Sequence, residues 1–376
     1  MFLQAYNGRP VVQFIVFFLR ISQEEVPMER VYILEDGVYL RKNGDNLVLT
    51  KNRQTLEEIP VRNLKQMVLA GYAALSGSVL QVLMQNRVET VFLDKNWRFQ
   101  GRLNVDEHKH VQRRIDQYRN LSDPEFVAES ARILVHGKLE NMARMLQVRG
   151  KRMKNQELLS KAAAIRALGK ELGSLQDVEL IRGCEGHASR LYFQVFDHLL
   201  TNKNFSFKGR SKRPPKDPVN ALLSFVYTLL TNEVQTAVKT VGLDPYLGAL
   251  HVIDYGRPSL ACDLVEEWRA FLGDRLVLGL INKKSISVDD FVYRDVKDTD
   301  FVDEKDLRSK RPVEMKPAIC RAFLQSYEKW MQQKILDPVS GKEFGCREYI
   351  FKQVQRFEKH LSQKEKYQPF LWAGRV

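Results

Sequence analysis

The sequence predicts an α+β fold, in which a small N-terminal β-domain is followed by a larger all-α domain. Residues 28–103 contain short runs of β-branched and aromatic residues separated by glycine-containing turns. From residue 126 to the end at residue 376, segments rich in Ala, Leu, Lys, Arg and Glu place apolar residues at helical spacing. The polar, charged run over residues 104–125 is predicted to be a linker between the two domains.

Turn signals within residues 28–103 organise the β-domain. Hairpins are predicted at Gly37 and Gly44, because each follows a run of strand-forming residues and glycine accepts the positive φ of tight turns. Ser76 or Ser78 can cap one short helix. No cluster of acids, His or Cys suited to chemistry lies here, so we expect this domain to serve as a scaffold or in dimer contacts.

Length, charge and cysteine content narrow the class of protein. The chain has 376 residues, enough for two or three domains, and its net charge of +13 favours a nucleic-acid partner over an anionic membrane surface. Its four cysteines are far apart in the sequence, which argues against a zinc knuckle and a disulfide scaffold. Reduced thiols in a cytoplasmic protein are expected.

The N-terminal segment is apolar but short. Its apolar run covers residues 11–19, whereas a transmembrane helix needs about 20 residues. No membrane association is therefore predicted. Residues 1–27 are expected to be an extension of unknown role.

The segment from residue 244 to residue 269 is the strongest candidate for a functional site. Ser259 can cap a helix whose apolar residues recur at helical spacing. On this helix, Asp263 and Glu266 are three residues apart, so their carboxylates project from one side.

His251 precedes this helix by a short connection through Gly256, Arg257 and Pro258, which can fold its imidazole back toward the two carboxylates. One imidazole and two carboxylates suit Mn²⁺ or Mg²⁺ better than a structural zinc ion. The alternative is an exposed acidic helix face beside an ordinary core histidine.

A third carboxylate, Glu185, lies in a predicted helix over residues 180–196. The residues around it are small, namely Gly183, Gly186, Ala188 and Ser189. A carboxylate in such a notch can be approached closely by a metal ion or a phosphate. The alternative is a packing helix softened by glycine. His187 is predicted to lie on another face.

Basic residues follow in a predicted loop over residues 202–220. Lys208, Arg210, Lys212 and Arg213 are interleaved with aromatic side chains at Phe205 and Phe207. Such a loop suits a DNA backbone together with unstacked bases, and the alternative is a solvated loop.

Basic residues of the preceding helices, such as Lys138, are expected to be exposed, either lining a nucleic-acid groove or simply solvated. A charged, exposed insertion is predicted over residues 294–316. Amphipathic helices are predicted over residues 317–335 and 347–361.

Four motifs in this order resemble the CRISPR-associated integrase and endonuclease family, the first-numbered Cas proteins. They cover residues 185–193, 207–225, 244–251 and 259–266. The resemblance extends over residues 28–370. It implies a sandwich-like β-domain, a helical catalytic domain, and a homodimer that joins the small second-numbered Cas protein. It also implies metal-dependent cutting and joining of double-stranded DNA, which inserts new spacers into a CRISPR array.

The resemblance also implies the roles of individual residues. Glu185, His251 and Glu266 match the family's metal ligands, and Asp263 matches an accompanying acid close to the metal. An acid in that place can orient His251 or hold a second water. Two other functions remain open: a DNA-binding assembly subunit without catalysis, and a nuclease that repairs branched DNA.

Overall fold

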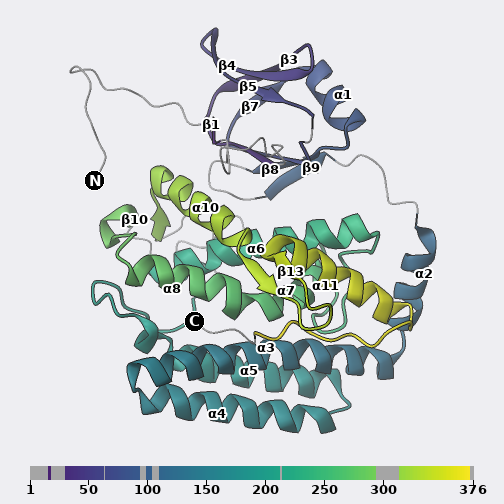
Figure 1. Ribbon diagram of the computed structural model, residues 1–376, viewed down its shortest axis with the longest axis vertical. Helices are drawn as coiled ribbons and strands as arrows, with labels where there is room; N and C mark the ends of the chain where they lie inside the picture. The colour runs from purple at the N-terminus through teal and green to yellow at the C-terminus, as the bar shows by residue number, and fades with distance from the viewer. Residues whose placement is uncertain are drawn as a thin grey trace. The chain divides into compact units, whose positions relative to one another are not determined.

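The computed structural model describes residues 16–17, 30–62, 64–93, 99–103, 110–211, 214–293 and 313–372. The chain forms two compact units, Met1–Glu107 and His108–Val376. Strands dominate the first unit and helices dominate the second (Figure 1). The predicted α+β class is therefore confirmed.

The N-terminal unit consists of two sheets and one helix. The first sheet has the order β1 (Val16–Phe17), β2 (Arg30–Ile33), β6 (Gln66–Ala70), β8 (Glu89–Leu93) and β9 (Phe99–Leu103). The second has the order β5 (Gln54–Pro60), β4 (Asn46–Lys51), β3 (Val38–Asn43) and β7 (Ala73–Leu75). Alternate residues of both sheets and the apolar face of α1 (Gly77–Gln85) share one core, as in a β-sandwich.

Only one of the two predicted hairpins forms. Gly44 has φ +56° and joins β3 to β4 in an antiparallel pair, as predicted. Gly37 also has a positive φ, but the strands on either side of it belong to different sheets. Strand β2 pairs in parallel with β6 instead. A turn signal indicates where the chain bends, but strand pairing depends on a partner that is distant in the sequence.

The C-terminal unit is a helical assembly around one hydrophobic core. Its helices are α2 (Val111–Asn120), α3 (Pro124–Met153), α4 (Gln156–Glu171), α5 (Val178–Gln194), α6 (Pro218–Val241), α7 (Ser259–Trp268), α8 (Arg275–Asn282), α10 (Pro317–Met331) and α11 (Cys346–Leu361). A π-helical turn, Arg269–Asp274, joins α7 to α8. The 30-residue helix α3 packs against α4, α5 and α7, and so brings distant parts of the chain together (Figure 1).

The predicted linker over residues 104–125 is wrong in part, because residues 111–120 form α2. The residue that α2 buries is a glutamine: Gln117 donates from its Nε2 to the carbonyl oxygens of Asp244 and Leu247, at 2.8 and 2.9 Å. Helical periodicity of apolar residues does not reveal a helix that docks through a polar side chain. This contact fixes the start of the segment that leads to His251.

The C-terminal predictions are largely confirmed. Helices α10 and α11 form, although α10 ends at Met331 because residues 334–336 form strand β12 (Lys334–Leu336), paired with β13 (Glu343–Gly345). Most of the predicted insertion, residues 294–312, lies outside the described residues. Its last part is not exposed loop, since β11 (Val313–Met315) pairs with β10 (Phe291–Tyr293) and buries Val313. Within the described ranges, no helix is long and apolar enough to span a bilayer.

Candidate active site

Helix α5 carries Glu185. The helix is capped by Asp177, which accepts a hydrogen bond from the Glu179 backbone, and it buries Ile181, Ala188 and Tyr192 in the core. A Cβ placed on Gly183 or Gly186 would meet nothing within 4 Å, so the two small neighbours of Glu185 border open space. Both glycines are exposed, whereas Glu185 is half-buried; His187 is exposed, away from the core face.

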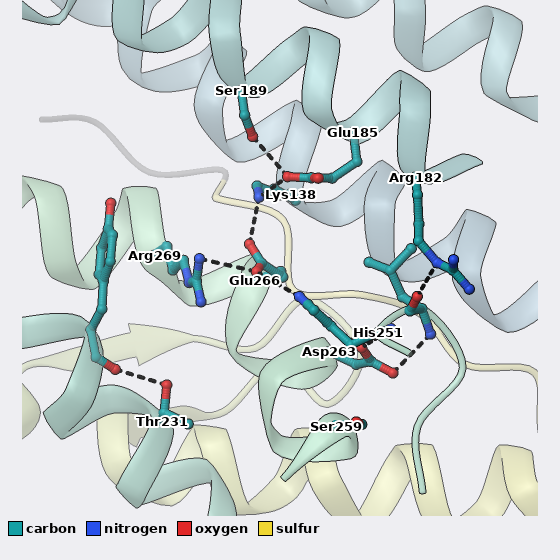
Figure 2. A network of polar contacts seen from close by, with 12 residues as sticks. Lys138, Arg182, Glu185, Ser189, Thr231, His251, Ser259, Asp263, Glu266 and Arg269 are labelled. Atoms are coloured by element: carbon teal, nitrogen blue, oxygen red, sulfur yellow. Dashed lines mark hydrogen bonds and ion pairs between the residues drawn. The ribbon is translucent and has the colours of Figure 1, made fainter. Parts of the chain in front are cut away.

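One turn later on α5, Ser189 donates a hydrogen bond from its Oγ to Oε1 of Glu185, at 2.8 Å. Arg182, one turn earlier, donates from its Nε to the Leu250 carbonyl oxygen at 2.6 Å. This contact attaches α5 to the segment that carries His251 (Figure 2). Because Arg182 and Glu185 belong to the same helix, this contact positions Glu185 relative to the backbone next to His251.

Helix α7 begins differently from the prediction. Ser259 does not cap it: Pro258 occupies the N-cap position and makes no side-chain cap hydrogen bond. Ser259 Oγ instead donates to the Val252 carbonyl oxygen at 3.1 Å. The serine therefore ties the start of α7 to the loop after His251, which is a tertiary contact that a capping pattern does not anticipate.

Asp263 is the residue that positions His251. It is fully buried, and its Oδ2 accepts hydrogen bonds from the backbone N–H groups of Ala249 and Leu250, at 2.6 and 3.0 Å. Its Oδ1 accepts from the backbone N–H of His251 at 2.9 Å and lies 2.6 Å from the ring Nδ1. Four donors therefore surround one carboxylate.

This arrangement selects the tautomer of His251. A carboxylate can only accept, so Nδ1 carries the proton in its contact with Asp263. The lone pair of the neutral ring is then on Nε2, which lies 4.0 Å from Oε1 of Glu266. Metal-binding histidines typically donate the N–H of their other ring nitrogen to a carboxylate, which fixes the ring as Asp263 does here. Asp263 is satisfied by its four donors and is better suited to orienting the ring than to holding an ion.

Glu266 lies at the centre of the site and receives two cations. Its Oε1 is 3.1 Å from Nη1 of Arg269, one turn later across the start of the π-helical turn. Its Oε2 is 2.6 Å from Nζ of Lys138, which comes from α3. The same ammonium group contacts Oε1 of Glu185, so that Lys138 lies between the two carboxylates (Figure 2).

The surrounding charges keep both glutamates ionised. Burial raises the pKa of Glu266, but Arg269, Lys138 and His251 outweigh it and lower the pKa to about 2. Burial also raises the pKa of Glu185, and here the Lys138 ammonium outweighs it and holds the pKa below its ordinary value. Burial lowers the pKa of Lys138, but Glu266 and Glu185 together raise it above its ordinary value. Both carboxylates are therefore negative at neutral pH.

These residues fit a divalent cation in their chemistry. Two ionised carboxylates and a ring nitrogen with a free lone pair are the donors that Mn²⁺ accepts, and Mg²⁺ accepts the carboxylates. Within the described ranges, no three His, Cys, Asp or Glu side chains already converge as a metal-binding group. The Lys138 ammonium instead occupies the position between Glu185 and Glu266, and it stands in for the positive charge of an ion.

Lys138 and Arg269 were not predicted as site residues. Lys138 was expected to be exposed, but it is buried. It lies in a helix rich in Lys and Arg, where composition does not distinguish the one lysine that faces inward. Arg269 had a weak signal in the sequence, because it follows Glu266 by three residues, within reach on one helix face.

The basic loop differs from its prediction in two respects. Phe205 and Phe207 are buried and pack on Phe291, Phe193 and Phe196, so the prediction that they stack on bases is wrong. Arg210 makes internal contacts: it donates to the Asn220 Oδ1 at 2.7 Å and its guanidinium lies 5.5 Å from the centre of the Tyr227 ring. Lys208 is exposed. Lys212 and Arg213 lie outside the described residues.

Comparisons with known proteins agree with this fold and site. The family profile of CRISPR associated protein Cas1 matches residues 31–311. The CRISPR-associated endonuclease Cas1 3 of Thermus thermophilus is 34% identical over 343 residues, which cover 90% of this chain and 96% of that protein. The CRISPR-associated endonuclease Cas1 1 of Chlorobaculum tepidum is 33% identical over 352 residues, covering 92% and 98%.

Solved structures share the fold. A Cas1 protein from Thermotoga maritima superposes with a TM-score of 0.75 at 24% identity, over 91% of this chain and 100% of that one. A casposase bound to its integration product also gives a TM-score of 0.75, at 21% identity, over 93% and 94% of the two chains. The fold, the profile match and the identity to the curated relatives lead to one conclusion: the chain belongs to the family of CRISPR-associated Cas1 proteins.

Proposed function

We propose that this endonuclease and integrase of CRISPR adaptation inserts spacer DNA into the CRISPR array at a divalent-metal site formed by Glu185, His251 and Glu266. The observation that carries the proposal is the placement of these three side chains: Lys138 links the two glutamates, and His251 Nε2 lies 4.0 Å from Oε1 of Glu266. The three come from separate parts of the chain, and a buried ammonium lies between the two carboxylates. A solvated acidic helix face would not bury Glu266 or fix the histidine ring through Asp263.

Strand transfer exchanges one phosphodiester for another. A DNA 3′-hydroxyl forms a new bond to phosphorus and loses its proton, while the bond to the leaving oxygen breaks. A bound Mn²⁺ or Mg²⁺ supplies Lewis-acid stabilisation of the negative charge that develops on the phosphoryl and leaving oxygens. Glu185 and Glu266 are already ionised at neutral pH in the metal-free protein, so neither has to lose a proton before it can hold such an ion.

The other residues prepare this site. Asp263 keeps the His251 ring in the tautomer whose Nε2 can coordinate an ion. Arg182, from α5, binds the carbonyl oxygen of Leu250 and so attaches the residue before His251 to that helix. Arg269 balances part of the negative charge at Glu266, which limits the repulsion between the carboxylates.

The test of the proposed function is the joining of a short DNA duplex to a supercoiled plasmid. We expect joined product with Mn²⁺ and none with a chelator. A protein that bound DNA equally well in both conditions and joined none would be a non-catalytic assembly subunit. If it cut branched DNA but joined no ends, the repair nuclease would be the better assignment.

Partners and location are also part of the proposal. We propose that the protein acts on double-stranded DNA as a homodimer together with the small second-numbered Cas protein. Light scattering after gel filtration should give twice the monomer mass, and a larger mass when the small partner is added. The expected cytoplasmic location rests on the four cysteines, all of which are free thiols.

Asp263→Asn is expected to lower the rate of DNA joining by about 10–100-fold, as loss of a group that orients a metal ligand commonly does. The amide has one acceptor oxygen in place of two, so it cannot satisfy four donors or favour the Nδ1–H tautomer. Joining rates at several Mn²⁺ concentrations measure the effect. A parental rate at every concentration would show that Asp263 does not position His251 for catalysis.

The basic loop is proposed to contact DNA phosphates through Lys208, Lys212 and Arg213. Neutralising the three should weaken DNA binding and reduce the slope of log affinity against log salt by about 2–3, as counterion release requires. The matched control exchanges lysine and arginine at the three positions and should keep the parental slope. Arg210→Ala should lower stability as well, because of its internal contacts. An unchanged slope in the neutral variant would remove these residues from the DNA interface.

A further inference from the structure

Lys138 is a buried cation that joins three helices. Its backbone belongs to α3, whereas Glu185 belongs to α5 and Glu266 to α7. The ammonium group contacts one oxygen of each glutamate, as Figure 2 shows. Burying an ammonium group is unfavourable unless it is paired and hydrogen-bonded, and these two carboxylates are the partners that allow it.

Lys138 in turn stabilises the two carboxylates. Without it, two negative groups would face each other in a partly buried site, where charge repulsion is stronger than in water. Arg269 pairs with Glu266 on Oε1, the oxygen opposite to the one that faces Lys138. Besides contacting Lys138, Glu185 accepts a hydrogen bond from the hydroxyl of Ser189, and a hydroxyl carries no net charge.

We propose that Lys138 is a built-in competitor of the divalent ion: its ammonium holds Glu185 and Glu266 together in the metal-free protein and has to withdraw when the ion binds. The proposal rests on the proposed metal site. An ammonium and a divalent ion held between the same two carboxylates compete for their negative charge and repel each other at such short range. The lysine therefore stabilises the metal-free fold and weakens ion binding.

Removing the charge of Lys138 should change both the affinity for Mn²⁺ and the unfolding temperature. Lys138→Met keeps much of the side-chain volume and removes the charge. We expect it to bind Mn²⁺ at least about tenfold more tightly than the parent in calorimetric titration, since a competitor and a nearby positive charge are both lost. Its unfolding temperature without metal should be lower than that of the parent, and Mn²⁺ should raise it further than it raises the parent's.

Lys151→Met is the matched control, because it makes the same change in charge at an exposed position of the same helix. It should bind Mn²⁺ as the parent does. If Lys138→Met does not fold without metal, Lys138→Gln, which retains hydrogen-bond donors, takes its place in the same titration. Equal or weaker Mn²⁺ binding by the neutral variant would overturn the proposal.

The experiment also separates this proposal from the proposed function. Glu185→Gln serves as the reference, because it removes one predicted ligand. If the parent binds Mn²⁺ no better than Glu185→Gln does, the metal site itself is misassigned. If the parent binds Mn²⁺ through Glu185 but Lys138→Met has the parental affinity, the site stands and only the competition by Lys138 is rejected.

Discussion

Glu185→Gln is expected to lower DNA joining by at least about 10³-fold while the protein remains folded. The substitution preserves shape but removes the negative charge that the ion requires, and a loss of about 4 kcal/mol of transition-state stabilisation corresponds to this factor. Glu185 is half-buried rather than part of the core, and glutamine has the same shape, so its neighbours need not repack. Initial joining rates with Mn²⁺ and thermal unfolding followed by circular dichroism measure the two effects.

His251→Ala should behave in the same way, because it removes the ring nitrogen that Asp263 holds in place. Glu171→Gln provides the control, since it makes the same chemical change at an exposed position at the end of α4. It should join DNA at the parental rate. If Glu185→Gln or His251→Ala joined strands as fast as Glu171→Gln, these side chains would not hold the catalytic ion.

The second large effect is expected at Gly248, where a side chain has no room. A Cβ at this position would collide with Oδ2 of Asp263 and would lie 2.8 and 2.9 Å from backbone atoms of Ser259 and Leu260. Backbone cannot move aside as a flexible side chain can, so Gly248→Ala must displace either the His251 segment or the start of α7. We expect a loss of about 2–4 kcal/mol in the free energy of unfolding, as for other overpacked or network-breaking changes.

Gly248→Ala should also lower DNA joining more than tenfold, because the displaced atoms include the carboxylate that orients His251. Urea unfolding and joining rates of the same preparation measure both consequences. Gly169→Ala in α4 is the control: its new Cβ meets nothing within 4 Å. It should gain about 0.5–1 kcal/mol from better helix propensity. Equal stability of the Gly248 variant and the parent would show that the close approach is relieved at no cost.

The spacing of residues in the sequence predicted much of the candidate site. Asp263 and Glu266 lie on one side of α7, and the short connection before it brings His251 to them. Both relations are local, so helical geometry was enough to predict them. The convergence of Glu185 on the same place depends on the packing of α3, α5 and α7, and only the family resemblance suggested it.

The missed features have a common physical cause. The tertiary fold decides whether a side chain in a mixed or polar stretch is exposed, and it buries Lys138, Phe205 and Gln117. A lysine is usually solvated and an aromatic residue in a basic loop suits a base, but here each packs against a partner that is distant in the sequence. The same reason explains the turn at Gly37, where the local signal was correct and the pairing of its strands was not.

The central claim is that Glu185, His251 and Glu266 together hold one divalent ion, and anomalous diffraction tests it most directly. Crystals of the parent protein soaked in Mn²⁺ would be measured near the manganese absorption edge. We predict one strong peak within bonding distance of Glu185, of His251 Nε2 and of Glu266, with the Lys138 ammonium moved away. A peak elsewhere, or no peak between these residues at saturating Mn²⁺, would contradict the account.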